Sequence, residues 1–225
     1  MPETTRRKLL AYTALAPLAG VCLAKGQSAK SSDTRTVSSS PREAARARYF
    51  PNVLLTTHEG KQVRFYDDLV KGKIVTLNFM YANCDGICPT VTANLVEVQK
   101  LLGQRIGRDI FMYSFTLKPE EDTPAVLKKY VEEHRVKPGW TFLTGKPDDI
   151  ELLRRSLGFV DPDPELDRDK SSHIGNVRYG NEPLMIWAAC PGMAHPHWLA
   201  ESIMFVDPNW KRPTAWGKKA AATGS

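Results

Sequence analysis

The sequence predicts an α/β protein built around one partly parallel sheet. Short runs of β-branched and aromatic residues alternate along the chain with segments whose apolar residues recur at helical spacing. A hydrophobic content of 42% in 225 residues is enough for one packed core. Lysines and arginines are spread among acidic residues rather than gathered in one run, which argues against a nucleic-acid partner.

The N-terminal residues 1–24 have the layout of a signal peptide, with a basic start and an apolar run from Leu9 to Ala24. That run is 16 residues long, shorter than the roughly 20 that span a bilayer as a helix. A cleaved signal is therefore preferred over a retained N-terminal anchor. The segment Thr5–Leu10 resembles a twin-arginine signal, except that Leu9 stands where that motif prefers Phe. We expect an exported protein, periplasmic or anchored and facing the periplasm, with membrane association only if the segment is retained.

Composition divides the rest of the chain into three predicted segments. Residues 25–48 are rich in Ser, Lys and Arg and poor in large apolar side chains, which predicts a flexible linker. Residues 49–208 carry the predicted domain. Residues 209–225 are predicted to be a frayed tail.

The first half of the domain predicts a hairpin, a buried strand and a helix. Two short apolar stretches within 53–69 flank a turn at Gly60. Residues 73–81 form a β-branched and aromatic run, typical of a strand buried on both faces. A helix is expected from Pro89 onward, because proline suits the first turn and apolar residues then recur at helical spacing.

The second half continues the alternation. Strands are predicted over 109–117 and 140–144, with helices starting at Thr123-Pro124 and covering 148–157. Asp122 is expected to cap the first of these helices, together with Thr123. The polar, proline-bearing residues 161–172 predict an exposed loop, 175–179 a strand and 198–206 a helix.

The motif Cys84-Asp-Gly-Ile-Cys88-Pro89 lies at the junction between the predicted buried strand and the predicted helix. Unpaired N–H groups and the helix dipole at such a junction stabilise a thiolate, which is both the reactive nucleophile and a soft metal ligand. Gly86 lets the loop bulge, so the two sulfurs can bind one metal ion or close into a disulfide.

Three interpretations of this pair stand beside one another. The pair can be an inert disulfide or two buried thiols, it can be half of a zinc site, or it can bind copper. No second close Cys/His pair supplies four zinc ligands in one local unit. Two sulfurs favour Cu(I), and an added imidazole accommodates Cu(II) as well. Without residues 1–24 the chain has three cysteines, and an odd number argues against a simple disulfide framework.

The stretch Phe79–Pro89, FMYANCDGICP, resembles the copper-site signature of Sco/SenC proteins. Further likeness lies in the YDDL at 66–69, the PEEDTP at 119–124 and the segment 140–145, so that the resemblance covers residues 50–160. The resemblance implies a thioredoxin-like fold with a central mixed sheet, flanking helices and an inserted hairpin. It also implies Cu(I)/Cu(II) binding by Cys84, Cys88 and a histidine, in the assembly of the dinuclear copper centre of cytochrome c oxidase.

By position, the histidine implied by the resemblance is His173. The family usually has an acidic residue before this histidine and an apolar strand after it, whereas this chain reads Ser171-Ser172-His173-Ile174-Gly175. The expected function is copper delivery to an oxidase subunit or another copper protein. The alternative is a thiol-disulfide oxidoreductase in which Cys84 and Cys88 are catalytic and reduce the cysteines of a copper-site partner.

A second set of soft ligands is formed by Cys190, His195 and His197. The preferred interpretation is structural: Cys190 packs as a small apolar residue, and the two histidines flank the start of a helix. A metal site is the less favoured alternative.

Overall fold

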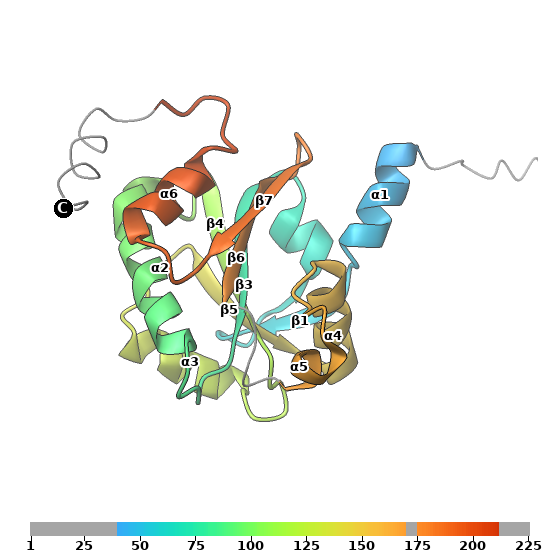
Figure 1. Ribbon diagram of the computed structural model, residues 1–225, viewed down its shortest axis with the longest axis vertical. Coiled ribbons are helices and arrows are strands. Elements are labelled where there is room, and N and C mark those ends of the chain that lie inside the picture. Colours follow the sequence, from blue (N-terminus) through green and yellow to red (C-terminus); the bar gives the residue numbers. More distant parts are fainter. Residues whose placement is uncertain (1–39, 170–174, 212–225) are drawn as a thin grey trace, which may run out of the picture. The chain divides into compact units, whose positions relative to one another are not determined.

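The computed structural model describes residues 40–169 and 175–211, which are built around a mixed sheet of seven strands. The sheet order is β2-β1-β5-β4-β3-β6-β7, with β3, β4 and β5 parallel and the other neighbouring pairs antiparallel (Figure 1). The strands are β1 (Leu54–Thr57), β2 (Gln62–Arg64), β3 (Ile74–Met80), β4 (Ile110–Thr116), β5 (Trp140–Gly145), β6 (Asn176–Asn181) and β7 (Ile186–Pro191).

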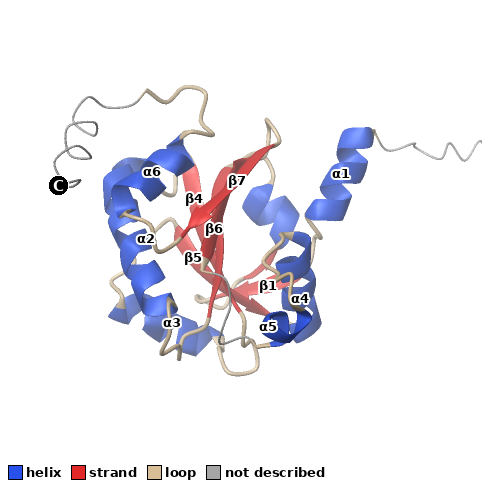
Figure 2. Cartoon of the chain, in the orientation of Figure 1, coloured by secondary structure: helices blue, strands red, loops and turns tan. Residues whose placement is uncertain are grey.

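Helices cover both faces of this sheet. The described helices are α1 (Pro41–Tyr49), α2 (Cys88–Leu102), α3 (Pro124–Glu133), α4 (Pro147–Ser156), α5 (Pro164–Arg168) and α6 (Pro196–Met204), with a π-helical segment η1 (Phe65–Val70) and a short 3₁₀ segment η2 (Gly103–Arg105). The crossovers through α2 and α3 both move across the sheet in the same direction, from β3 to β4 and from β4 to β5. Right-handed crossovers of this kind place both helices on one face of the sheet. Helix α6 lies on the same face. The opposite face is covered by α4 and α5 (Figure 2). The predicted α/β class is confirmed.

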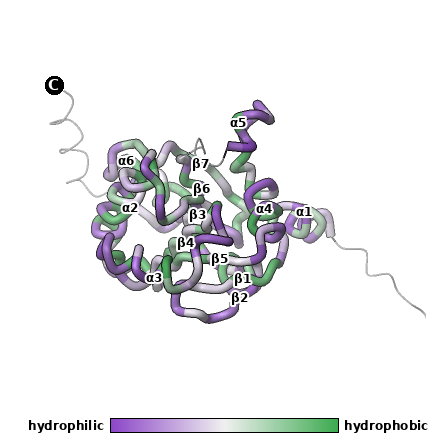
Figure 3. The backbone as a smooth tube through the Cα atoms, turned by 90° about the horizontal axis from the view of Figure 1, so that it is seen from below, coloured by the Kyte–Doolittle hydropathy of each residue, from purple (hydrophilic) through white to green (hydrophobic). Residues whose placement is uncertain are grey.

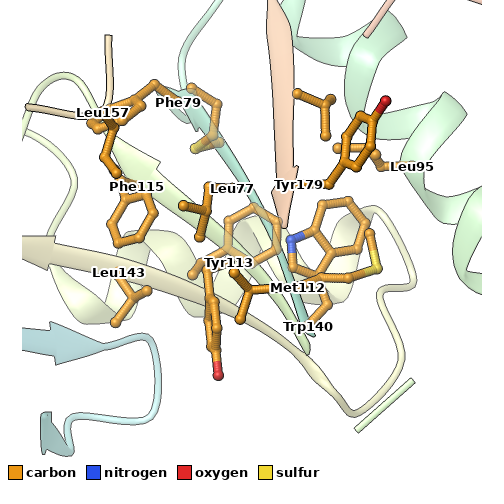
Figure 4. Packing of buried hydrophobic residues seen from close by; sticks show 14 of the residues in the cluster. Leu77, Phe79, Leu95, Met112, Tyr113, Phe115, Trp140, Leu143, Leu157 and Tyr179 are labelled. Carbon is orange, nitrogen blue, oxygen red and sulfur yellow. The ribbon is translucent and has the colours of Figure 1, made fainter. Parts of the chain in front are cut away.

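The core lies in two layers on either side of the sheet. Strand β3 has six buried residues out of seven, as expected for a central strand covered on both faces. On the α4 face, Leu77, Phe79 and Phe115 pack toward Leu157 (Figure 4). On the α2 face, Met112, Trp140 and Tyr179 pack toward Leu95.

Most predicted elements are present. The hairpin at Gly60 joins β1 to β2, and Gly60 has φ +83°, a conformation that costs glycine little. The predicted strands over 73–81, 109–117, 140–144 and 175–179 correspond to β3, β4, β5 and β6. The predicted helices correspond to α2, α3, α4 and α6.

Three segments differ from expectation. The predicted linker 25–48 is helical from Pro41, where Ser40 and Glu43 form a capping box, an S-x-x-E signal in the sequence. The predicted loop 161–172 contains α5, whose Asp167 accepts hydrogen bonds from the Arg154 guanidinium. Strand β7 was not predicted, because it is an edge strand without apolar alternation and exists through its pairing with β6.

The N-terminal segment 1–24 and most of the predicted tail lie outside the described residues. Within the described ranges, no helix has the length and hydropathy needed to cross a membrane. Figure 3 shows that α5 and the outer turns of α3 are largely hydrophilic.

Candidate functional site

Residues 81–88, which lead from β3 into the first residue of α2, carry both cysteines of the motif, and we call them the cysteine loop. Strand β3 ends at Met80, and α2 begins at Cys88 with a proline in its first turn, as predicted. Ile87, which precedes the helix, makes no side-chain cap. Instead the sulfur of Cys84 accepts hydrogen bonds from the backbone N–H groups of Gly86 and Cys88. The sulfur of Cys84 therefore accepts hydrogen bonds from backbone N–H groups that would otherwise lack a partner at the start of α2.

The two cysteines are free thiols in the structure and both are buried, with exposed fractions of 7% for Cys84 and 2% for Cys88. The thiol of Cys88 donates a hydrogen bond to the sulfur of Cys84, which brings the two side chains into direct contact. This is the arrangement that either a shared metal ion or a reversible disulfide requires.

The two thiols differ in acidity because their surroundings differ. Burial raises the pKa of Cys84, but hydrogen bonds from the Tyr81 hydroxyl, the Cys88 thiol and backbone N–H groups outweigh it and hold the pKa below its ordinary value. Burial and the hydrogen bond to Cys84 raise the pKa of Cys88 to about 12. The first proton to leave the pair therefore leaves Cys84.

This inequality predicts selective alkylation of the reduced, metal-free protein. Because the pKa of Cys84 is lowered and that of Cys88 is raised, thiolate appears on Cys84 first as the pH increases. At pH 7 iodoacetamide should label Cys84 at least about tenfold faster than Cys88, because only the thiolate attacks. Peptide mass spectrometry after timed quenching measures both rates in one sample. Equal labelling of the two cysteines would contradict the assignment.

Tyr81 is a site residue that the sequence analysis did not single out. Its hydroxyl donates to the sulfur of Cys84, and its ring lies under the ammonium of Lys118, 4.7 Å from the ring centroid. The hydrogen bond to Cys84 and burial raise the pKa of Tyr81, so it remains a donor at neutral pH. An aromatic residue three positions before the first cysteine, at the end of a buried strand, was the available signal.

Asp122 does not cap α3, contrary to expectation. Thr123 provides that cap, because its hydroxyl accepts from the N–H of Val126. The carboxylate of Asp122 is instead buried behind the cysteine loop, where it accepts hydrogen bonds from the N–H of Ala82 and the hydroxyl of Thr116. Burial raises its pKa, although both hydrogen bonds act in the opposite direction. Asp122 thus ties the loop that carries Cys84 to the end of β4.

Removing this tie should loosen the cysteine loop. The change Asp122→Ala leaves the Ala82 N–H without its acceptor, and we expect a loss of about 1–3 kcal/mol in the free energy of unfolding. The change Asp122→Asn keeps an oxygen acceptor and should cost less than half as much. Urea unfolding of the reduced protein compares the two variants. Equal losses would mean that the carboxylate charge matters more than the acceptor.

The other predicted ligands are distributed differently. His173 lies outside the described residues. Cys190 is buried, as predicted, and lies in β7; its sulfur is 3.8 Å from the carbonyl oxygen of Val177, and burial raises its pKa to about 12. His195 caps α6, where its Nδ1 accepts from the N–H of His197. Across the described ranges, no three His, Cys, Asp or Glu side chains are grouped to hold a metal ion.

The SCO1/SenC family model matches residues 42–177, which is more than half of the chain and includes the cysteine loop. The chain belongs to the SCO1/SenC family.

Individual Sco proteins match over shorter stretches. The SCO1 protein homolog of Bacillus subtilis is 35% identical over 88 residues, which make up 39% of this chain and 44% of that protein. The mitochondrial SCO1 homolog 1 of Arabidopsis thaliana is 29% identical over 102 residues, 45% of this chain and 29% of that protein. The chain thus spans about half the length, or less, of these curated relatives.

Solved Sco structures share the fold. Bradyrhizobium japonicum ScoI with copper bound superposes with a TM-score of 0.55 at 24% identity, over 68% of this chain and 96% of that one. Yeast Sco1 with copper bound gives a TM-score of 0.56 at 20% identity, over 70% and 91%. The predicted thioredoxin-like fold is confirmed by this likeness.

Proposed function

We propose that this Sco protein binds copper through Cys84, Cys88 and His173 and delivers it to a respiratory copper enzyme. The observation that carries the proposal is the pair of buried, touching, free thiols at the start of α2, one of them with a lowered pKa. Thiolates in a water-poor site suit Cu(I), and one imidazole added to them suits Cu(II). Family members whose structures were solved with copper bound support the same cargo.

The surroundings of the pair support a third ligand from the segment before β6. A Cβ placed on Gly175 would come within 2.4 Å of the side chain of Ile87, so the chain entering β6 runs against the cysteine loop. The N–H of Gly192 donates to the carbonyl of Gly175 at 2.7 Å, which fixes this entry point. His173 is two residues away, and two residues reach at most about 7 Å.

Asp169 is the last described residue before the segment that contains His173. Its charge acts on the hydroxyl of Tyr81, the group that donates to Cys84. Asp169 thus acts on Tyr81 and Gly175 contacts Ile87, and His173 stands between Asp169 and Gly175 in the sequence. In the proposed site it supplies the imidazole nitrogen that two thiolates lack.

Delivery requires a recipient and a location. One solved relative is described as a member of the Sco family of cytochrome c oxidase assembly proteins. We infer that the recipient is a copper-receiving oxidase subunit, with its dinuclear copper centre as the destination. The signal-like residues 1–24 support export to the periplasm or anchoring that faces it.

Copper titration of the full-length protein tests this proposal. One Cu(I) and, separately, one Cu(II) should bind per chain in competition with a chromophoric chelator. His173→Ala should abolish tight Cu(II) binding and weaken Cu(I) binding by about 10- to 100-fold, because Cu(I) keeps both thiolates. His134→Ala is the matched control, since His134 lies at the end of α3 and contacts Tyr130. Unchanged Cu(II) affinity in His173→Ala would remove this residue from the ligand set.

The unequal thiols favour a second candidate, a thiol-disulfide oxidoreductase. The Cys84 thiolate attacks a partner disulfide, forms a mixed disulfide and releases one partner thiolate. The Cys88 sulfur, after losing its proton, attacks Cys84, which closes the Cys84–Cys88 disulfide and releases the second partner thiolate. Both electrons come from the dithiol, so this activity should survive in His173→Ala and disappear in Cys84→Ser.

A further inference from the structure

A pocket of about 300 Å³ opens on the α4 face of the sheet, on the side opposite α2. Its volume is at the lower end of the roughly 300–1,000 Å³ typical of small-molecule sites. The lining is mainly apolar and comes from α1, β3, the end of α4 and the β6–β7 hairpin. The residues that matter here are Ala45, Leu77, Leu157, Arg178, Met185 and Trp187.

Strand register explains why this space exists. Leu77 of β3 is paired with Arg178 of β6, and Gly180 of β6 is paired with Trp187 of β7, so these residues share one face of the sheet. Gly180 has no side chain, and a Cβ there would come within 2.3 Å of the Trp187 ring. The indole therefore lies directly against the sheet, with Phe50 at 4.8 Å between ring centroids.

The outer wall of the pocket is α1, which is held in place by specific contacts. The guanidinium of Arg46 forms an ion pair with the buried carboxylate of Glu182 at 2.6 Å. That carboxylate also accepts hydrogen bonds from the hydroxyl of Tyr66 and the N–H of Gly72. The buried carboxylate of Glu182 thus links α1 to the rest of the domain.

Arg178 has an unusual environment for a half-buried arginine. Its guanidinium donates to the carbonyl of Gly158 at 3.0 Å and lies 5.5 Å from the Phe159 ring centroid, and burial lowers its pKa. No carboxylate of the described residues lies within ion-pair distance. The other arginines there that are not exposed, Arg46, Arg105 and Arg154, each pair with a carboxylate. A cation with partly lost hydration and no counter-charge is a ready site for an anion.

Trp187 adds a hydrogen-bond donor that has no partner in the described part of the chain. Its indole N–H is buried, and it finds no acceptor among the described residues. Buried polar groups without partners are uncommon in folded proteins. The pocket lining is therefore mainly apolar, and two of its residues, Arg178 and Trp187, carry groups that favour an acceptor.

We propose that this pocket binds a small amphiphile with one carboxylate head, such as a medium-chain fatty acid. The hydrocarbon chain fills the apolar space above Leu77 between Leu157 and Met185. The carboxylate lies on the Arg178 guanidinium at the mouth. This binding function is separate from the copper proposal, because the pocket and the cysteine loop share no residue.

Calorimetric titration of the full-length protein with octanoate, below its micellar concentration, tests this inference. One octanoate should bind per chain, and 1-octanol, which lacks the charge, should bind at least about tenfold more weakly. Arg178→Met should weaken octanoate binding by about 10- to 100-fold and leave octanol within about twofold. The matched control is Arg108→Met, which removes an exposed arginine from another surface.

Two further variants keep the test decisive. Ala45→Trp fills the pocket from the surface of α1 and should abolish binding of both probes. The double variant Cys84→Ser/Cys88→Ser should bind octanoate normally, so a failed copper proposal leaves this result unaffected. Equal affinity for octanoate and octanol, or unchanged octanoate binding in Arg178→Met or Ala45→Trp, would overturn the inference. Circular dichroism of each variant establishes that it is folded.

Discussion

Serine in place of Cys84 or of Cys88 is expected to abolish tight Cu(I) binding. Four-ligand zinc sites gain about 10–16 kcal/mol on binding, so one ligand contributes about 2.5–4 kcal/mol. Loss of one thiolate should therefore weaken Cu(I) binding by about 100- to 1,000-fold. The hydroxyl of serine is a hard, weakly acidic donor and does not replace sulfur for a soft ion. Competition with a chromophoric Cu(I) chelator measures the change.

The chain provides its own control for this experiment. Cys190 is a third buried thiol, but it packs in β7 beside the carbonyl of Val177. Cys190→Ala removes a cysteine without touching the proposed ligands, and its Cu(I) affinity should stay within about twofold of the wild type. Wild-type affinity in Cys88→Ser, or an equal loss in Cys190→Ala, would be incompatible with a site built on Cys84 and Cys88.

Arg154→Met is expected to be strongly destabilising. Arg154 is 4% exposed, and its guanidinium donates to both carboxylate oxygens of Asp167, to Glu151 and to the carbonyl of Phe159. The hydrogen bonds to Asp167 and Glu151 raise its pKa, so it is charged at every working pH. Breaking a buried pair by removing one partner costs about 3–5 kcal/mol, because the other charge stays buried.

Arg155→Met is the matched control for Arg154→Met. Arg155 is the next residue of α4 and contacts the same two carboxylates, but its side chain is 62% exposed. Exposed pairs contribute about 0–1 kcal/mol. Chemical unfolding of the two variants should therefore differ by at least about 2 kcal/mol. Similar losses in both variants would show that burial does not set the strength of this network.

The Arg154→Met variant also tests how copper is released. Asp167 belongs to α5, which leads toward His173, and the Arg154–Asp167 pair ties α5 to α4. If His173 is a ligand, loosening this tie should make it leave the ion more easily. We expect copper transfer from Arg154→Met to a chelator to be about tenfold faster than from Arg155→Met. Stopped-flow transfer at a temperature where both variants are folded provides the comparison.

Several features of the protein were determined by local sequence alone. The α/β class, the buried strand β3 and the start of α2 follow from residue periodicity and from Pro89, which act over a few neighbouring positions. The cysteine pair could be identified for the same reason, because strand end, loop and helix start are contiguous. The capping box at Ser40 and Glu43 was also readable, although the composition of 25–48 favoured a linker.

Other features depend on residues that are far apart in the chain. Strand β7 exists because β6 offers it a partner, and Asp122 serves the cysteine loop because β4 and the start of α3 bring it behind Ala82. The Arg154–Asp167 pair joins two helices, and the pocket beside Arg178 is bounded by four separate segments. Sequence patterns record only which face of an element is apolar. The tertiary structure decides which polar groups meet there, because buried charges and hydrogen-bond donors must find partners wherever the packed chain places them.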